Sequence, residues 1–239
     1  MCPQNRGKIL HQEGKYFNFA IMKEIIFTNP HRKKHFDFFR SMSQPHFNIC
    51  APVDISQLLN WIKSENLPFT LTMVYCLSRI ANNIPEFRRR IRGDSVWEHE
   101  KVDPSFTIET KVSDVFSFCH VPFTDNYTTF LKRGHIKSAQ MQEAPIFEDE
   151  EGRDDLLFLS SLPWISFTGI THAMHCPSTD SVPRITWGKY STEKNVTSMP
   201  LSVQVHHALV DGKQVGIFFH LLQELLDYPE KISTENNLF

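Results

Sequence analysis

Two adjacent histidines followed by an aspartate stand out as residues that could carry proton-transfer chemistry. The segment HHALVDG spans residues 206–212, between a predicted strand and a predicted helix. Imidazole has an unperturbed pKa close to neutrality, so a histidine fixed at such a junction can act as a general base. Neighbouring strand residues point to opposite faces, so His206 and His207 do not face the same cleft. Asp211 can cap the following helix, and Gly212 permits a tight turn.

Two other interpretations of this segment follow from its residue types. A lone H-x-x-x-D is more often a packed histidine beside a capping aspartate, because short patterns of common residues arise by chance. A metal site built from His207, Asp211 and His220 is weaker still, since His220 lies well down the predicted helix. No separate group of ligands has the spacing of a zinc site. We therefore expect no bound metal.

The hydrophobic pattern predicts the elements that position this segment. In the last strand Leu201, Val203 and Val205 alternate with polar residues, and the final helix has one apolar face. The predicted strands begin at Met22 and cover 47–53, 95–99, 105–112, 116–122, 156–161, 165–174, 184–190 and 199–206. The predicted helices cover 31–42, 71–83, 126–142 and 212–226, and a further helix follows Asp54, which has the chemistry of an N-cap.

These elements predict a single α/β domain over residues 22–239, a two-layer sandwich of a large mixed β-sheet with helices packed on it. Residues 1–21 are polar and are expected to form a weakly structured extension, so Met22 could be an alternative start. The acidic stretch 148–152 predicts a solvated loop. A cluster of basic residues predicts a solvated helix end; its members are Arg88, Arg89, Arg90 and Arg92.

Composition excludes several classes of protein. The 25 Lys and Arg residues against 27 Asp and Glu residues give a formal charge of −2, which disfavours a nucleic-acid or anionic-membrane binder. Only 9 glycines and no phosphate-loop motif argue against a nucleotide-binding fold, whereas 20 phenylalanines predict an aromatic-rich core or pocket. The cysteines are widely spaced, no run of apolar residues is long enough to span a bilayer, and the first residues contain no apolar leader. These features are typical of a cytoplasmic protein.

Several sequence blocks, HHALVDG among them, occur together and in order in a known family. They are HRKKHFDFF (31–39), VDPSFTIET (102–110), LSSLPWISF (159–167), PRITWGKY (183–190) and PLSVQVHHALVDG (200–212). In these blocks the chain resembles chloramphenicol acetyltransferase, from about Met22 to Leu226. The resemblance implies a fold of the coenzyme A-dependent acyltransferase type. Separate blocks in register are far more specific than one motif, so they favour function over chance for the histidine pair.

The resemblance implies a role for each residue that matches the family's catalytic set. His207 matches the general base that takes the proton from the acceptor hydroxyl. Ser160 matches the hydrogen-bond donor to the tetrahedral oxyanion. Thr186 matches a threonine that helps to stabilise the same intermediate through a water. Asp211 matches an aspartate that pairs with an arginine, here Arg32, to hold the catalytic corner in shape.

The resemblance also implies acetyl-CoA as the acyl donor and a homotrimer with its sites between subunits. Trp164, Lys189 and Tyr190 match positions along the coenzyme channel, with Lys189 near the nucleotide phosphate. Judged by residue type alone, these three positions, together with Ser160 and Thr186, would be ordinary strand, core or surface residues. The implied partners are small molecules and further copies of the chain, without nucleic acid or membrane.

The acceptor pocket is where the chain departs most from the family. The residues that match pocket positions are Phe39, Phe47, Glu109, Phe147 and His172. Phe39 stands where a tyrosine is common, and Glu109 stands where the drug enzymes carry a phenylalanine. His172 and Arg184 replace aliphatic residues. A charge facing an apolar drug is costly unless it is paired, and Glu109 with Arg184 is one possible pair.

Three functions remain open on this basis. The complete catalytic set favours acetylation of chloramphenicol. The altered pocket favours acetylation of another small hydroxylated or amino acceptor. A noncatalytic trimer that binds a ligand in the cleft is the third alternative, and the intact catalytic residue types disfavour it.

Overall fold

The computed structural model describes residues 22–147, 152–174 and 179–234. The predicted N-terminal extension and the acidic residues 148–151 therefore lie outside the described residues. Within the described ranges, no helix combines the length and the apolar composition needed to cross a bilayer.

Helices and strands are interspersed along the chain, with a run of four consecutive strands both before and after the fourth helix. The helices are α1 (Pro30–Arg40), α2 (Ser56–Glu65), α3 (Phe69–Asn83), α4 (Tyr127–Glu143) and α5 (Gly212–Asp227), with short 3-10 turns at Pro85–Arg88 and Pro229–Ile232. The strands are β1 (Met22–Ile25), β2 (His46–Asp54), β3 (Arg89–Arg92), β4 (Ser95–His99), β5 (Asp103–Ile108), β6 (Ser117–His120), β7 (Leu156–Leu162), β8 (Arg184–Gly188), β9 (Ser191–Glu193) and β10 (Val196–His206). The predicted N-cap of α2, Asp54, is one residue off: Ile55 occupies the N-cap position, and the Asp54 carboxylate accepts from the Ser56 amide just beside it.

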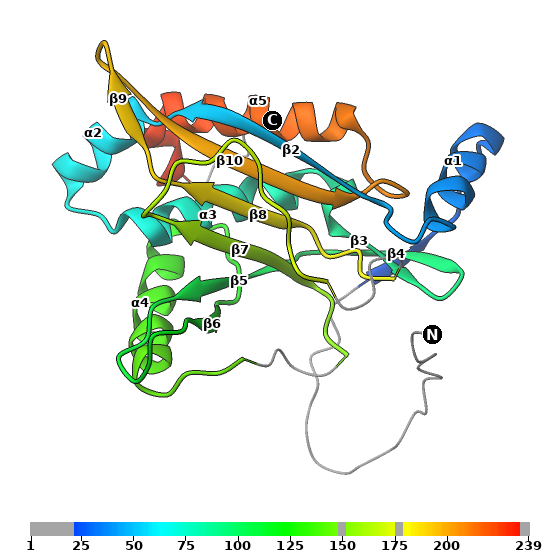
Figure 1. Ribbon diagram of the computed structural model, residues 1–239, viewed down its shortest axis with the longest axis horizontal. Coiled ribbons are helices and arrows are strands. Elements are labelled where there is room, and N and C mark those ends of the chain that lie inside the picture. Colours follow the sequence, from blue (N-terminus) through cyan, green and yellow to red (C-terminus); the bar gives the residue numbers. More distant parts are fainter. Residues whose placement is uncertain (1–21, 148–151, 175–178, 235–239) are drawn as a thin grey trace.

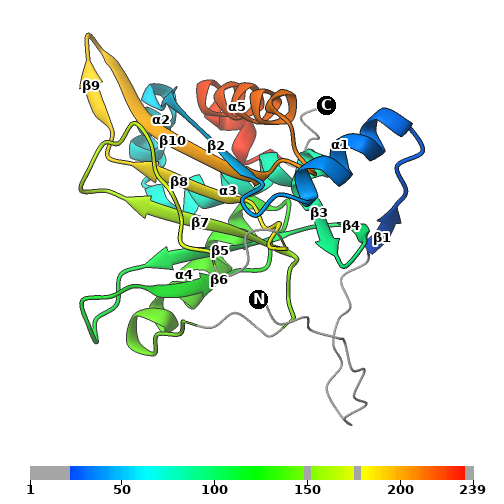
Figure 2. The same ribbon diagram turned by 45° about the vertical axis from the view of Figure 1, so that its right-hand side comes forward.

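A mixed sheet forms the centre of the fold. Its strand order is β2-β10-β8-β7-β5-β6, with β9 paired to β10, and a smaller sheet has the order β1-β4-β3. The pairs β5–β7 and β7–β8 are parallel, whereas β2–β10 and β8–β10 are antiparallel. Figures 1 and 2 show α3 and α5 together on one face of the large sheet, with α1 set apart at one end. The predicted fold class, a mixed sheet with helices packed on it, is confirmed.

The long strand β10 is buried on both faces, which fixes the position of everything at its end. Leu201, Val203 and Val205 are fully buried in the hydrophobic core. The alternate residues Ser202 and Gln204 are also buried, on the opposite, polar face of the sheet. A strand paired on both sides and covered on both faces is a rigid support, so the residue that follows it is held firmly.

The segment 165–174 is not a strand, contrary to the prediction. It runs as an irregular chain across the polar face of the sheet, where Asn48 donates from Nδ2 to the carbonyl of Ile170 at 2.6 Å. The Ile165 carbonyl accepts from the Lys189 amide at 2.8 Å, just beyond the end of β8. A side chain and a single backbone amide thus take the place of a strand partner at these two carbonyls, so the β-rich residue types do not lead to strand pairing.

The arginine cluster is not a solvated helix end, which corrects another prediction. Arg89–Arg92 form strand β3, and Arg90 is fully buried. The Arg90 guanidinium donates to the carbonyls of Phe87, Asp154 and Leu156 at 2.9, 2.6 and 2.5 Å. These carbonyls replace the water that the charge loses on burial, so the arginine joins the small sheet to the start of β7.

A carboxylate beside Arg90 gives a test of this junction. Burial alone would raise the pKa of Asp154, but hydrogen bonds from Arg92 at 2.6 and 2.8 Å and from His99 at 2.9 Å hold it well below its ordinary value. Removing one partner of a fully buried ion pair typically costs roughly 3–5 kcal/mol, and the Asp154 side chain is partly exposed to solvent. Replacing Asp154 with asparagine should therefore lower the free energy of unfolding at pH 7 by about 2–3 kcal/mol.

The effect has a definite pH dependence. Since the pKa of Asp154 is depressed in the folded state, its contribution is complete above the unfolded value of about 4 and is lost as the pH falls below it. Urea unfolding of the parent and variant should therefore differ at pH 7 and converge toward pH 2–3. Asp94→Asn, on a 94% exposed side chain, is the matched control. An equal difference at both pH values would contradict the assignment.

Candidate active site

A tight turn over residues 206–211, here called the His207 turn, connects β10 to α5. The His207 amide donates to the Pro45 carbonyl at 2.9 Å, and the amides of Leu209 and Val210 both donate to the His206 carbonyl. Asp211 is the N-cap of α5 and forms a capping box with Gln214. The rigid strand and the capped helix together fix where the His207 side chain lies.

Two phenylalanines hold the His207 ring. Phe39 stacks on it with ring centroids 3.8 Å apart and planes at 23°, and the Phe47 centroid lies 4.5 Å away. The side chain is 25% exposed, so part of the imidazole is accessible. An imidazole clamped between aromatic rings but open at one edge is suited to exchanging a proton with a bound molecule. Phe39 and Phe47, both predicted pocket residues, therefore contact the predicted base directly.

Arg32 supports the His207 turn through its carbonyls. Its Nη2 donates to the carbonyls of Ala208 at 2.8 Å and Leu209 at 3.0 Å. The expected direct ion pair between Arg32 and Asp211 is not present among the described contacts. The Asp211 carboxylate instead accepts from the Gly212 amide at 2.7 Å and lies 4.0 Å from Nδ1 of His207. Capping of α5 draws the carboxylate toward the helix axis, so carbonyls take its place as acceptors for the guanidinium.

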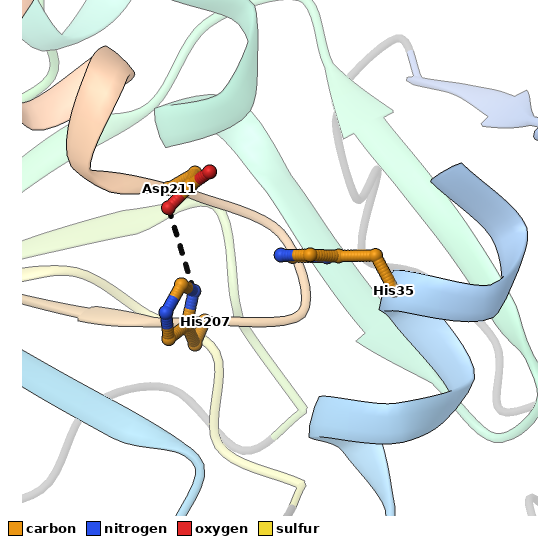
Figure 3. Close-up of side chains that lie close together, drawn as sticks. All are labelled: His35, His207 and Asp211. Carbon is orange, nitrogen blue, oxygen red and sulfur yellow. Dashed lines mark ion pairs between the residues drawn. The ribbon is translucent and has the colours of Figure 1, made fainter. Parts of the chain in front are cut away.

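One residue at this site escaped the sequence analysis. His35 lies on α1, and its ring centroid is 5.5 Å from that of His207, in an edge-on arrangement. Figure 3 shows its ring directed toward the space between Asp211 and His207. His35 follows Arg32 by three residues, a spacing that places both on one side of a helix, and this was the signal available in HRKKHFDFF.

The three side chains in Figure 3 also meet the simplest condition for a metal site. One ligand atom each from His35, His207 and Asp211 lies within 4.8 Å of the others. However, Nη1 of Arg32 lies 2.8 Å from Nδ1 of His35. Arginine can only donate, so this nitrogen accepts and the proton of a neutral ring sits on Nε2, the atom facing the cluster. The arrangement therefore favours hydrogen bonding over metal coordination.

Ser160 and Thr186 lie side by side in the sheet. They are direct partners in the parallel pair β7–β8, and Thr186 is in turn paired with Ser202 of β10. The Ser160 hydroxyl lies 3.2 Å from Oγ1 of Thr107. The Thr186 hydroxyl is buried and has no hydrogen-bond partner among the described residues. Two hydroxyls thus point the same way from adjacent strands, as a shared contact with one bound group requires.

One chain does not bring these hydroxyls to His207. Ser202, the residue level with Ser160 and Thr186, lies four residues before the end of β10 at His206. At about 3.3 Å per residue, this separation is roughly 13 Å along the strand, before the lateral distance across β8 is added. Within a single copy, the predicted base and the predicted oxyanion donor therefore belong to different regions of the surface.

The residues predicted to bind the coenzyme gather at one edge. Trp164 and Tyr190 are 67% and 45% exposed. Gly188 brings their two segments together, because a Cβ at this position would lie 2.9 Å from the Ile165 carbonyl. The Lys189 amide, next along the chain, donates to the same carbonyl. Two large exposed rings beside a lysine are suited to a ligand with a planar and an anionic part.

The remaining pocket residues differ in their surroundings. Arg184 pairs with Asp180 at 2.5 Å, so the predicted pair with Glu109 is wrong; Glu109 is exposed. Burial, followed by the charge of Arg184, lowers the pKa of His172, which favours a neutral ring. Phe147 is 52% exposed and packs in an aromatic cluster with Phe116 and Phe118.

Comparison with known proteins decides the family. The sequence model described as chloramphenicol acetyltransferase matches residues 18–223. The chain belongs to this family. A chloramphenicol acetyltransferase of Proteus mirabilis is 31% identical over 196 residues, which cover 82% of this chain and 90% of that relative. One of Bacillus pumilus is 29% identical over 212 residues, covering 88% and 96%. The predicted family and the predicted class of enzyme, an acyltransferase, are confirmed.

Solved structures extend the likeness to the fold. A chloramphenicol acetyltransferase superposes with a TM-score of 0.74 at 27% identity, covering 86% of this chain and all 100% of the other. A dihydrolipoamide acetyltransferase of Azotobacter vinelandii superposes with a TM-score of 0.65 at 15% identity, covering 84% and 89%. The second likeness shows a shared fold alone. This acyltransferase therefore has the architecture of its family.

Proposed function

We propose that this acyltransferase moves an acetyl group from acetyl-CoA to a hydroxyl of chloramphenicol. The observation that carries the proposal is the partly exposed His207 ring, clamped by Phe39 and Phe47 at the end of a rigid strand. Membership of the family and its relatives' names support the reaction and the acceptor. A fixed imidazole with one accessible edge is what a general base in such a transfer requires.

The proposed chemistry needs no covalent enzyme intermediate. His207 takes the proton of the acceptor hydroxyl while the hydroxyl oxygen attacks the thioester carbonyl carbon. The Ser160 hydroxyl donates to the carbonyl oxygen as it becomes an oxyanion, a contact typically worth about 10²–10³-fold in kcat. When the tetrahedral intermediate collapses, the C–S bond breaks and the histidinium returns its proton to the departing thiolate. Thr186, with its unpartnered hydroxyl, would hold a water against the same intermediate.

The proposed assembly is a homotrimer with its sites between subunits. The sheet register supports it, because His207 and Ser160 of one copy are well separated while both are needed at one reacting carbon. A neighbouring copy would supply the wall carrying Ser160. Trp164, Lys189 and Tyr190 would then line the approach of acetyl-CoA, with the lysine toward a phosphate.

The assay that tests this function follows free coenzyme A. The purified protein, acetyl-CoA and chloramphenicol are mixed, and the released thiol is measured with a chromogenic disulfide. Release that depends on both substrates and exceeds the level of the His207→Ala variant is the expected result. Release at the level of that variant would overturn the proposal for this acceptor. A noncatalytic binding role would instead leave ligand affinity and biological effect unchanged by that substitution.

A second candidate keeps the reaction and changes the acceptor. It is favoured by the Arg184–Asp180 ion pair and the neighbouring His172. These side chains give the proposed acceptor pocket a polar wall where the family usually has an aliphatic one. Such a wall suits a more hydrophilic hydroxylated or amino acceptor, whose groups can satisfy those of the protein. The same thiol assay, run with a panel of small alcohols and amines, separates the candidates. A higher kcat/KM for a polar acceptor than for chloramphenicol would select the second.

A further inference from the structure

Two rows of side chains lie next to each other on the polar face of the large sheet. One row contains Ser160 and Thr186, which are direct partners in the pair β7–β8. The other row lies two residues earlier on each strand and contains Phe158 and Arg184, which are also direct partners. Alternate residues of a strand share a face and lie about 7 Å apart. A small molecule whose reacting hydroxyl lies at Ser160 can therefore reach Arg184 with its other end.

Arg184 is fixed in an ion pair on this face. Its Nη2 donates to the Asp180 carboxylate at 2.5 Å, its Nη1 donates to the Val182 carbonyl at 3.1 Å, and the guanidinium lies over the Phe158 ring at 5.2 Å. The side chains of Arg184 and Asp180 are 12% and 25% exposed, so the pair is mostly buried but keeps an accessible edge. At this edge a guanidinium donor and a carboxylate acceptor lie together, and their charges cancel.

Two imidazoles beside the pair add hydrogen-bonding groups without adding charge. Burial lowers the pKa of His46 to about 4, against the opposing charge of Asp180. Burial, followed by the charge of Arg184, also lowers the pKa of His172. Nε2 of His172 is buried and has no hydrogen-bond partner among the described residues. Because buried polar groups in folded proteins are normally paired, this nitrogen marks a place where the described chain leaves hydrogen-bonding capacity unfilled.

We propose that the Arg184–Asp180 pair selects a neutral, hydroxyl-rich acceptor, such as a sugar or another polyol, over one that bears an amino or an acidic group. A hydroxyl can accept from the guanidinium and donate to the carboxylate, so it satisfies both without separating them. The inference rests on the proposed function, because it places the acceptor beside Ser160, and it narrows the second candidate to hydroxylated molecules.

The charge balance of the pair is the reason for this selectivity. An ammonium group only donates and a carboxylate only accepts, so either one is attracted by one member of the pair and repelled by the other. To bind, a charged group would have to separate Arg184 from Asp180. That separation would leave one charge buried and unpaired, which is costly.

Three methyl glycosides that differ at a single group provide the test. They are methyl glucoside, which is neutral, methyl glucuronide, which carries a carboxylate, and methyl glucosaminide, which carries an amine. Saturation-transfer NMR titrations of the unsubstituted protein at neutral pH give a Kd for each. We expect methyl glucoside to bind at least about tenfold more tightly than either charged glycoside. Equal or tighter binding of a charged glycoside, or no binding of methyl glucoside, would overturn the proposal.

An isosteric substitution shifts the expected preference. Asp180→Asn keeps the shape of the side chain but leaves the Arg184 charge unbalanced, so the Kd of methyl glucuronide should fall by about tenfold or more. The matched control is Asp94→Asn, on a 94% exposed side chain, which should leave all three Kd values unchanged. An unaltered order of affinities in Asp180→Asn would contradict the role of the pair. If that variant fails to fold, the titrations of the unsubstituted protein decide.

The thiol-release assay separates this inference from the proposed function. If the expected order of affinities is found but no acceptor releases coenzyme A, the selectivity stands and the proposed reaction fails. If chloramphenicol is acetylated but the three glycosides bind equally, the reaction stands and the inference is wrong.

Discussion

Replacing His207 with alanine should lower kcat for acetyl transfer by about 10²–10⁴-fold, the range that a positioned general base contributes. No other titratable side chain among the described residues shares its position between Phe39 and Phe47 at the end of β10. Without the imidazole, the acceptor hydroxyl must lose its proton to water. The KM for acetyl-CoA should change little, because the residues proposed to bind the coenzyme lie elsewhere.

The matched control for this substitution is His220→Ala on α5. His220 is 73% exposed and contacts Glu224 at 3.5 Å, so its loss should leave kcat unchanged. The thiol-release assay measures both variants, and thermal unfolding checks that both fold. Because the His207 side chain packs between two aromatic rings, His207→Gln is a useful second variant that keeps more of that packing. A kcat for either His207 variant within a factor of two of the parent would contradict the role of the imidazole.

The second large effect is a recovery of activity by mixing two inactive variants. His207→Ala lacks the base, and Ser160→Ala lacks the oxyanion donor, which is typically worth about 10²–10³-fold. If each site takes one residue from each of two copies, some interfaces in a mixed assembly contain both intact residues. Every cyclic trimer that contains both variants has one complete interface in three, so mixed assemblies should recover about one third of the parent activity.

Co-expression with two different affinity tags provides the measurement. Sequential purification on both tags isolates assemblies that contain both variants, and the thiol assay gives their turnover. Each variant purified alone, and the two mixed after purification without exchange, are the controls. If tag-verified mixed assemblies are as inactive as the single variants, His207 and Ser160 do not act across an interface, and the proposed assembly is wrong.

The sequence alone predicted the elements around the site well, because their patterns are local. Leu201, Val203 and Val205 marked the face of β10 that enters the core, and the capping aspartate marked the start of α5. The prediction of a strand over 165–174 was wrong for a physical reason: this segment covers the polar face of the sheet, where the Asn48 side chain donates to the Ile170 carbonyl. Residue types do not reveal that a neighbouring side chain will replace a strand partner.

Charged residues were the hardest to place from sequence. Arg90 belongs to a run of arginines that is typical of a solvated surface, yet its side chain is buried. Three backbone carbonyls accept hydrogen bonds from its guanidinium, and two of them belong to residues far along the chain. Glu109 was one possible partner for Arg184, but Asp180, four residues before it, takes that place. His35 was missed because it lies beside His207, which belongs to a distant part of the sequence. The long-range partners of Arg90 and His35 are set by tertiary contacts that residue spacing does not encode.

The register that separates Ser160 from His207, at the end of β10, has a consequence for the cell that makes this protein. If the reaction needs residues from two copies, a newly made or diluted chain has no turnover of its own. Mass action then links specific activity to protein concentration, with a steep rise near the dissociation constant of the assembly. Expression level would set not only how many enzymes are present but also what fraction of them can work.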